Sequence, residues 1–343
     1  MGPFEQSPFH AGEQACQERV GVRSRIEQIG RKIIRSSMPD QHREMFGQLP
    51  FLIVGSLDEG RRPWASILVG QPGFVASPDP WTLGVNALPG FGDPLRQNLK
   101  LGAPLGLLGI QLETRRRNRM NGTVSELVDG RFSVRVDQSF GNCPQYIQAR
   151  APVFVDEPAR VLEPRPVRRE GPRLSKDSMG LISSADTFFI ATASAAAQGN
   201  DPVEGVDVSH RGGKPGFVRV TEDRGHTILT APDFSGNLLF NTLGNLALHP
   251  RAGLLFVDFA SGGLLSLTVE AEVLWDGPEL EAFAGAERLV RFRVTEGLWI
   301  EHGVPLRWSA AKPAPQLAAT GSWQEADQVM AAAASLGDEL DSP

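Results

Sequence analysis

The sequence contains an internal repeat, and this feature limits the possible folds more than any other. Three segments occur twice in the same order: FLIV (51–54) with FFIA (188–191), GQPGFV (70–75) with GKPGFV (213–218), and Asn98-Leu99 plus Gly106-Leu107-Leu108 with Asn245-Leu246 plus Gly253-Leu254-Leu255. The offset is 143 residues at the second match and 147 at the third, which one four-residue insertion explains. The chain is therefore predicted to be a tandem duplication with the order β-β-β-α-β-β in each copy.

Each copy has the pattern of a small β-domain. In the first copy, Phe51–Ser56, Trp64–Val69 and Trp81–Val85 are short runs rich in apolar residues, and turn residues separate the first two. Closing such strands into a barrel removes exposed sheet edges, whereas a doubly wound fold needs alternating strands and helices. We therefore expect a mainly β (α+β) fold of two tandem β-barrels with an N-terminal helix.

A helical segment precedes the first copy. Between Glu13 and Ser36 the apolar residues lie on one helical stripe, formed by Val22, Ile26, Ile29 and Ile33. Pro39 interrupts this pattern, and Asp40 is placed to cap a second, short helix.

The connecting segments have their own composition. Five prolines and many charges between residues 152 and 173 are typical of an exposed linker. From Ala310 onward the chain is rich in Ala and Pro, which predicts a loosely attached tail with one short helix near 322–336. The predicted divisions are an N-terminal helical segment (1–39), a first repeat (40–151), a Pro-rich linker (152–174), a second repeat (175–310) and a C-terminal tail (311–343).

Charge and composition exclude several classes of protein. The formal net charge is −6 and the basic residues are scattered apart from one cluster, which argues against nucleic-acid binding. No stretch reaches the roughly 18 apolar residues of a membrane span, and the N-terminus lacks a secretory pattern. We therefore expect a cytoplasmic protein without a membrane partner. Cys16 and Cys143 are far apart and no histidines have metal-ligand spacing, so we expect no metal.

Two segments of the second copy carry the strongest signs of a binding site, DVSHRGGKPGFVR (207–219) and PDFSGNLLFNTLGNL (232–246). In the first, Ser209 and Arg211 offer hydrogen-bond donors beside Gly212, where a flat ligand can approach the backbone. The second places Ser-Gly-Asn near the start of a predicted helix, where free N–H groups favour a phosphate. A plain hairpin turn and an ordinary helix cap are the alternative interpretations.

With HPRAGLLFVDF (249–259), these segments resemble the pyridoxamine 5′-phosphate oxidase-like family of FMN-binding split barrels. The likeness spans about 40–310 and is closer to bacterial members without an assigned substrate than to the vitamin B6 enzyme. It implies two split barrels that form a pseudo-dimer within one chain, with FMN in the groove between them, and leaves a homodimer open. The residues that it implies for the flavin are Ser209, Arg211, Gly212, Asn237, Asn241, Thr242 and Asn245.

Two departures from that family matter. Many relatives carry an arginine near the position of Phe234 or Leu239, and this chain has none there. The first repeat has SILVGQ (66–71) in place of SxRGG, so we expect one flavin site per chain.

An arginine cluster offers the missing charge. On a strand, Arg115, Arg117 and Arg119 share one face, which predicts fork-shaped donors in the groove. We expect at least one of Arg116, Arg117 and Arg119 to contact flavin or substrate, and Arg117 above all. The alternative is a solvated strand edge that resists aggregation.

The predicted activity is FMN-dependent oxidoreduction of a small-molecule substrate, with NAD(P)H as a candidate electron donor. Arg211 is expected to stabilise negative charge on the reduced ring. By residue type, Cys143, Tyr146 and His210 are the candidate catalytic groups, and His10 is a further acid–base candidate. A flavin carrier or sensor without turnover, and a haem-binding or haem-degrading split barrel, remain open as alternatives.

Overall fold

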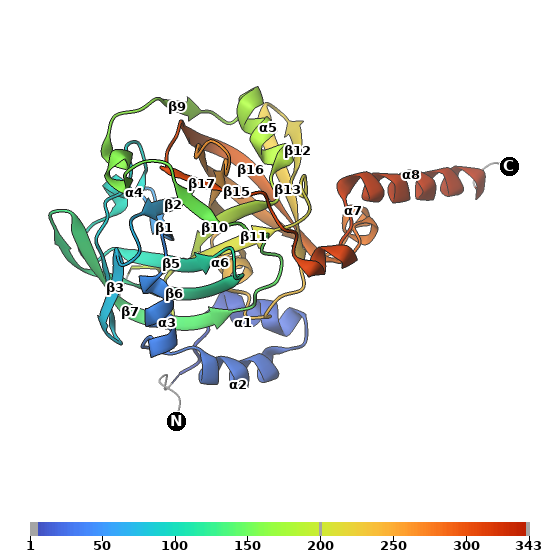
Figure 1. Ribbon diagram of the computed structural model, residues 1–343. Helices are drawn as coiled ribbons and strands as arrows, with labels where there is room; N and C mark the ends of the chain where they lie inside the picture. Colours follow the sequence, from blue (N-terminus) through green and yellow to red (C-terminus); the bar gives the residue numbers. More distant parts are fainter. Residues whose placement is uncertain (1–5, 199–200, 341–343) are drawn as a thin grey trace.

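The computed structural model describes residues 6–198 and 201–340, and the fold is mainly β (Figure 1). The first sheet has the strand order β2-β1-β5-β6-β7-β4-β3. Its strands are β1 (Phe51–Leu57), β2 (Pro63–Val69), β3 (Val75–Asp79), β4 (Thr82–Val85), β5 (Pro104–Gln111), β6 (Arg116–Val128) and β7 (Arg131–Asn142).

The second sheet repeats this order as β11-β10-β14-β15-β16-β13-β12. Its strands are β10 (Thr187–Ala193), β11 (Val206–Gly212), β12 (Arg219–Asp223), β13 (His226–Phe234), β14 (Arg251–Val257), β15 (Leu264–Leu274) and β16 (Ala286–Ile300). Every neighbouring pair in both sheets is antiparallel. The shared order is the one that a duplicated chain should have. In the described residues each sheet stays open, because its two end strands do not pair with each other.

Each half has one more strand on either side of its helix than the predicted order. The helix between β4 and β5 is α4 (Leu95–Asn98), and its counterpart between β13 and β14 is α6 (Asn241–Leu248). The predicted match of FLIV with FFIA is also wrong by one residue. Phe51 pairs with Val69 and Thr187 pairs with Gly212, so Phe51 corresponds to Thr187 and not to Phe188. Two runs of apolar residues align equally well at either register, and only the pairing fixes it.

The other helices lie outside the sheets. They are α1 (Ala11–Arg19), α2 (Arg23–Ile33), α3 (Asp40–Gly47), α5 (Lys176–Ser184), α7 (Pro278–Ala282) and α8 (Trp323–Leu340), with 3₁₀ turns η1 (Pro158–Leu162) and η2 (Pro315–Ala319). The predicted single helix from Glu13 to Ser36 is wrong, because Gly21 takes a φ of +70° and separates α1 from α2. Asp40 does not cap α3 either, since it lies in the first turn and pairs with Arg43.

The predicted linker is held by strand pairing, and the predicted tail is docked at the start of α8. The linker contains β8 (Pro152–Phe154), which pairs with β17 (Leu306–Trp308), and β9 (Val167–Glu170), which pairs with β16. Although α8 projects from the body (Figure 1), its first residue is docked. Trp323 is buried, and its indole N–H donates to the carbonyl of Phe217 at 2.9 Å. A loosely attached tail is therefore wrong for this end of α8.

The two halves pack against each other through a shared apolar core. One apolar core lies inside each half, and a third joins β1, β2 and β5 to β10, β11 and β14. A Cβ on Gly106 would lie 2.5 Å from the carbonyl oxygen of Val206, and one on Gly253 would lie 2.5 Å from that of Pro63. Glycine is required at both positions because each half presses one strand against the backbone of the other. In the part of the chain described, no helix is long and apolar enough to span a membrane.

Candidate functional site

A groove lies between the two halves, with about 860 Å³ of empty space including its opening to solvent. The first half contributes the start of β6 and the loop after β7, and the second half contributes β11, the 232–243 segment and Arg288 of β16. Its wall carries four arginines and, among the described residues, a single carboxylate, that of Asp233.

Arg119 lies at the inner end of the groove, where it joins the two halves. Its side chain is buried, with one guanidinium nitrogen 3.2 Å from Oδ1 of Asp207 and another donating to Oγ of Ser209. Asp207 also accepts bonds from Asn121 and Asn245, at 2.7 Å and 2.9 Å. Burial lowers the pKa of Arg119, and Asp207 opposes that shift. Asp207 therefore fixes both the position and the charge of this arginine.

Arg117 has a different environment. Its Nε donates to the carbonyl of Cys143 at 2.7 Å, and Nη1 lies 3.4 Å from the carbonyl of His210. No carboxylate pairs with it among the described residues. Burial lowers its pKa to about 9, and the neighbouring Arg211 and Arg119 add to the shift. A partly buried cation that repels its neighbours and lacks a carboxylate partner is a favourable place for an anionic ligand.

Arg211 and Arg288 lie on either side of Asp233. Arg288 is buried and contacts Oδ2 of Asp233 with both Nε and Nη2 at 2.9 Å. Arg211 is partly exposed and lies 3.4 Å from Oδ1. Because Arg288 already neutralises this carboxylate, Arg211 adds positive charge to the wall of the groove.

The loop before α6 lines the groove in an unusual conformation. Leu238 and Phe240 have φ values of 61° and 64°, a region that residues with a Cβ seldom adopt. Such backbone strain is concentrated at functional sites. The helix starts at Asn241, four residues beyond Asn237, so the predicted Ser-Gly-Asn segment precedes the helix and does not cap it. Asn237 instead donates to Oδ1 of Asn142 at 3.2 Å, across the boundary between the halves.

Three predicted catalytic candidates border the groove. Tyr146 stacks on Phe234 with 5.0 Å between ring centroids, and burial raises its pKa. Cys143 is a partly exposed free thiol in the same loop. His210 is buried, neither ring nitrogen has a hydrogen-bond partner, and burial and Arg117 lower its pKa well below the usual range. A neutral imidazole in this position is a poor acid, so the prediction of an acid–base role for His210 finds no support in its environment.

The structure brings most of the predicted residues together. Those that line the groove are Ser209, Arg211, Gly212, Asn237, Asn241, Thr242, Arg117, Arg119, Cys143, Tyr146 and His210.

Four predicted residues lie elsewhere. Arg116 is exposed on the other face of β6, and Asn245 is buried behind the groove on Asp207 and Thr192. His10, which precedes α1, lines a separate polar pocket together with Glu13 and Asp207. Arg115 precedes β6 with a φ of 56° and donates to the carbonyl of Ile147, so it does not share a face with Arg117.

Sequence reasoning missed Arg288, Asp233, Asp207 and Asn142. The sequence shows no arginine in the loop near Phe234 because the cation arrives from β16, about fifty residues later in the chain. Asp233 and Arg288 lie opposite each other in neighbouring strands β13 and β16. This pairing would have identified Arg288, but it requires knowledge of the strand register. No three His, Cys, Asp or Glu side chains in the described residues are placed to hold a metal ion.

The matching groove of the duplication lacks these features. Leu108 pairs with Arg119 and the equivalent Leu255 pairs with Ser266, so serine replaces the inner arginine. Val304 and Leu306, which follow β16, belong to the third core. The inner arginine is therefore present on β6 and replaced at the equivalent position of β15.

No family model and no curated protein matches the chain. Parts of it are similar to solved structures. A Clostridium acetobutylicum protein related to general stress protein 26 (pyridoxinephosphate oxidase family) is 12% identical over 41% of this chain and 94% of that chain, with a TM-score of 0.25. An FAD-binding protein from Mesorhizobium loti is 12% identical over 39% and 97%, with a TM-score of 0.24. HutZ, the haem storage protein of Vibrio cholerae, is 15% identical over 38% and 95%, with a TM-score of 0.25. Similarities at this level assign neither family nor activity, so function has to be inferred from the groove itself.

Proposed function

We propose that the chain is an FMN-dependent oxidoreductase of the cytoplasm, with one flavin in the groove. We further propose that its two sheets are tandem split barrels that form a pseudo-dimer within one chain. The carrying observation is the charge of the groove. Asp207 pairs with Arg119 and Asp233 pairs with Arg288, whereas Arg117 has no carboxylate partner among the described residues. Arg211 adds a further positive charge, because Arg288 already neutralises Asp233. A phosphate monoester carries about −1.5 to −2 charges at neutral pH and so complements this surplus.

The residues present fit such a group. Arg119 and Asn142 line the groove, and the Nε of the first and the Nδ2 of the second are buried without a hydrogen-bond partner among the described residues, so each residue has a donor left for a ligand. A side chain on Gly212 would collide with the carbonyl oxygen of Tyr146, which keeps the wall at that point free of side chains. We assign the phosphate to Arg117 and Arg119 and the ring system to Ser209, Arg211 and Gly212.

When bound, the flavin supplies electron and hydride transfer. Arg211 would stabilise negative charge on the reduced ring, since its own charge is only weakly balanced by Asp233 at 3.4 Å. Tyr146 keeps its proton at neutral pH because burial raises its pKa, so it can donate a hydrogen bond to a substrate at the mouth of the groove. The substrate is a small molecule, and a nicotinamide is the proposed electron donor.

The absorbance spectrum of the purified protein, followed by titration with FMN, tests this proposal. We expect flavin bands and about one flavin per chain, because only one groove carries the arginines. Two flavins per chain would refute the single site, and a Soret band would favour haem instead. Oxidation of NADH or NADPH by the flavin-loaded protein then separates an enzyme from a carrier or sensor. A protein that takes up neither flavin nor haem would refute the proposal.

A further inference from the structure

Helix α1 lies outside the duplicated halves, yet it touches the groove's helix α6 directly. A side chain on Gly12 would collide with the carbonyl oxygen of Gly244, and a Cβ on Gly244 would lie 2.5 Å from the backbone nitrogen of Glu13. Two helices that meet at glycines approach each other backbone to backbone. Side chains of α1 therefore reach the segment that leads into α6.

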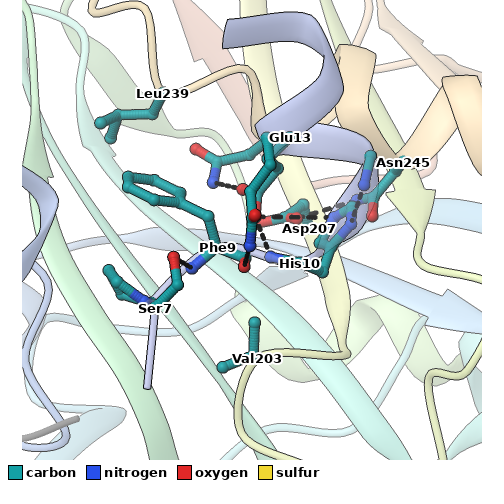
Figure 2. A network of polar contacts seen from close by, with 12 residues as sticks. Ser7, Phe9, His10, Glu13, Val203, Asp207, Leu239 and Asn245 are labelled. Atoms are coloured by element: carbon teal, nitrogen blue, oxygen red, sulfur yellow. Dashed lines mark hydrogen bonds and ion pairs between the residues drawn. The ribbon is translucent and has the colours of Figure 1, made fainter. Parts of the chain in front are cut away.

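Two of these side chains bind the strained loop. Nε2 of Gln17 donates to the carbonyl of Leu239 at 3.1 Å, and Oε1 of Glu13 accepts a hydrogen bond from Asn241. Gln17, Glu13 and Asn241 are all buried, so water does not compete for these bonds. Figure 2 shows Glu13 beside Asp207, with Leu239 above Phe9. Apolar packing adds to the contact, since Leu239 belongs to the cluster of Phe9.

The hydrogen bond from Gln17 lies at the strained part of the loop. Leu239 lies between Leu238 and Phe240, the two residues with positive φ. Residues with a Cβ are strained in this region, and the surrounding structure must offset that strain. The carbonyl of Leu239 has no helical partner at this point, because α6 starts only at Asn241. Gln17 supplies the missing donor and so favours the conformation that turns the loop toward the groove.

The same network continues to the arginines. Asp207 accepts from Asn245 of α6 on one oxygen and from Arg119 on the other. Ser209, which Arg119 also contacts, lies 3.1 Å from Oγ1 of Thr242 at the first turn of α6. The loop, α6 and Arg119 therefore form one connected polar unit. Burial and Asp207 raise the pKa of Glu13 well above its usual range, so a neutral Glu13 avoids an extra negative charge in this unit.

We propose that α1 belongs to the ligand site, with Glu13 and Gln17 as positioning residues that hold loop 237–242 in its binding conformation. The role in flavin binding rests on the proposed function, whereas the hold on the loop does not. Neither residue contacts the groove, so both act through the loop.

Hydrogen–deuterium exchange of the ligand-free full chain tests the hold on the loop. Gln17→Met keeps length and volume but removes the donor, and Glu13→Leu removes the acceptor. One lost hydrogen bond of about 0.5–1.5 kcal/mol corresponds to roughly 2- to 12-fold faster exchange at amides 237–242. Glu13→Gln should restore slow exchange, because the carbonyl oxygen of the introduced amide can still accept the hydrogen bond from Asn241. Glu18→Leu, on the exposed face of the same helix, is the matched control.

FMN titration of the same variants tests the effect on binding. We expect the FMN dissociation constant to rise by a similar factor in Gln17→Met and Glu13→Leu, and to return in Glu13→Gln. Unchanged exchange in a folded Gln17→Met protein would overturn the proposal, as would faster exchange with unchanged FMN affinity. A wild-type protein that binds no FMN refutes the proposed function, while the exchange comparison still decides whether α1 holds the loop.

Discussion

Replacing Arg117 by Met tests the assignment of the phosphate most directly. Methionine keeps an unbranched chain and removes the charge and every donor. Two of the five N–H groups of Arg117 already go to the carbonyls of Cys143 and His210, the second at a long 3.4 Å, which leaves donors for a ligand. A charge-assisted hydrogen bond contributes about 1.5–3 kcal/mol, so the FMN dissociation constant should rise roughly 10- to 150-fold.

Riboflavin provides the internal comparison, because it has the same ring without the phosphate. Losing the two carbonyl contacts of Arg117 can shift the loop around Cys143, and such a shift would weaken both flavins equally. Loss of a phosphate contact weakens FMN alone and reduces the dependence of its affinity on salt. Arg116→Met is the matched control, since this neighbour is exposed on the other face of β6.

Each variant is titrated by fluorescence with FMN and with riboflavin, at low and at moderate salt. These titrations measure both the selectivity for FMN and the salt dependence of its affinity. We expect Arg117→Met to affect FMN selectively and Arg116→Met to affect neither flavin. Equal losses for FMN and riboflavin would refute the phosphate assignment, and so would an equal effect of the two substitutions. In either case the arginines serve the substrate or the packing of the loop.

Three further predictions concern stability. Expressed separately, residues 40–170 and 175–310 should give insoluble or flavin-free material, because each exposes its share of the third core; a soluble, flavin-loaded second half would contradict this. Gly106→Ala should destabilise the chain by about 1–3 kcal/mol in denaturant unfolding, because its Cβ would lie 2.5 Å from a carbonyl of β11. Gly180→Ala, in open space on α5, should instead stabilise by about 0.5–1 kcal/mol. Burial lowers the pKa of His42 to about 4 in the folded state. Between about pH 6.5 and pH 4 the unfolded state therefore binds a proton on His42 that the folded state does not bind. The free energy of unfolding should thus fall as the pH falls through this range. His42→Asn should make that part of the stability profile less steep without removing the slope, because the pKa of buried His210 is lowered as well; an unchanged slope would show that His42 does not contribute.

The sequence repeat predicted correctly that the two halves share one strand order, because this inference depends on spacing alone, but it missed one strand on either side of each helix. GQPGFV and GKPGFV mark the same turn in each half, with Gly70 and Gly213 lying against Phe74 and Phe217 in the same way. Runs of apolar residues define the alignment of the two halves less well than these turn motifs do. FLIV matches FFIA at two registers, and only hydrogen-bond pairing distinguishes them. The single predicted helix failed for a different reason. The apolar stripe starts only at Val22, so it supports α2 alone, and Gly21 with its positive φ separates α2 from α1.

The candidate site was predictable where its residues are close in the chain and unpredictable where they are not. Ser209, Arg211 and Gly212 stand together in one strand and were expected together. Arg288 and Asp233 are brought together only by the pairing of β13 with β16. The strand-face argument for Arg115 failed because β6 begins one residue later and Arg115 belongs to the turn. Positions next to a strand end are the least certain part of such an argument.

The duplication also explains why the site needs the whole chain. The equivalents of β6 and β11 in the duplication are β15 and β2. Among the described residues, Arg117 and Arg119 lie on β6 and β15 has no arginine, while the SxRGG segment lies on β11 and not on β2, so both line the same groove. On β15, Ser266 takes the place of Arg119, and its Oγ lies 3.5 Å from the carbonyl of Ala65 on β2. Neither half therefore supplies all the residues of the candidate site, and the covalent link between the halves keeps their two contributions together.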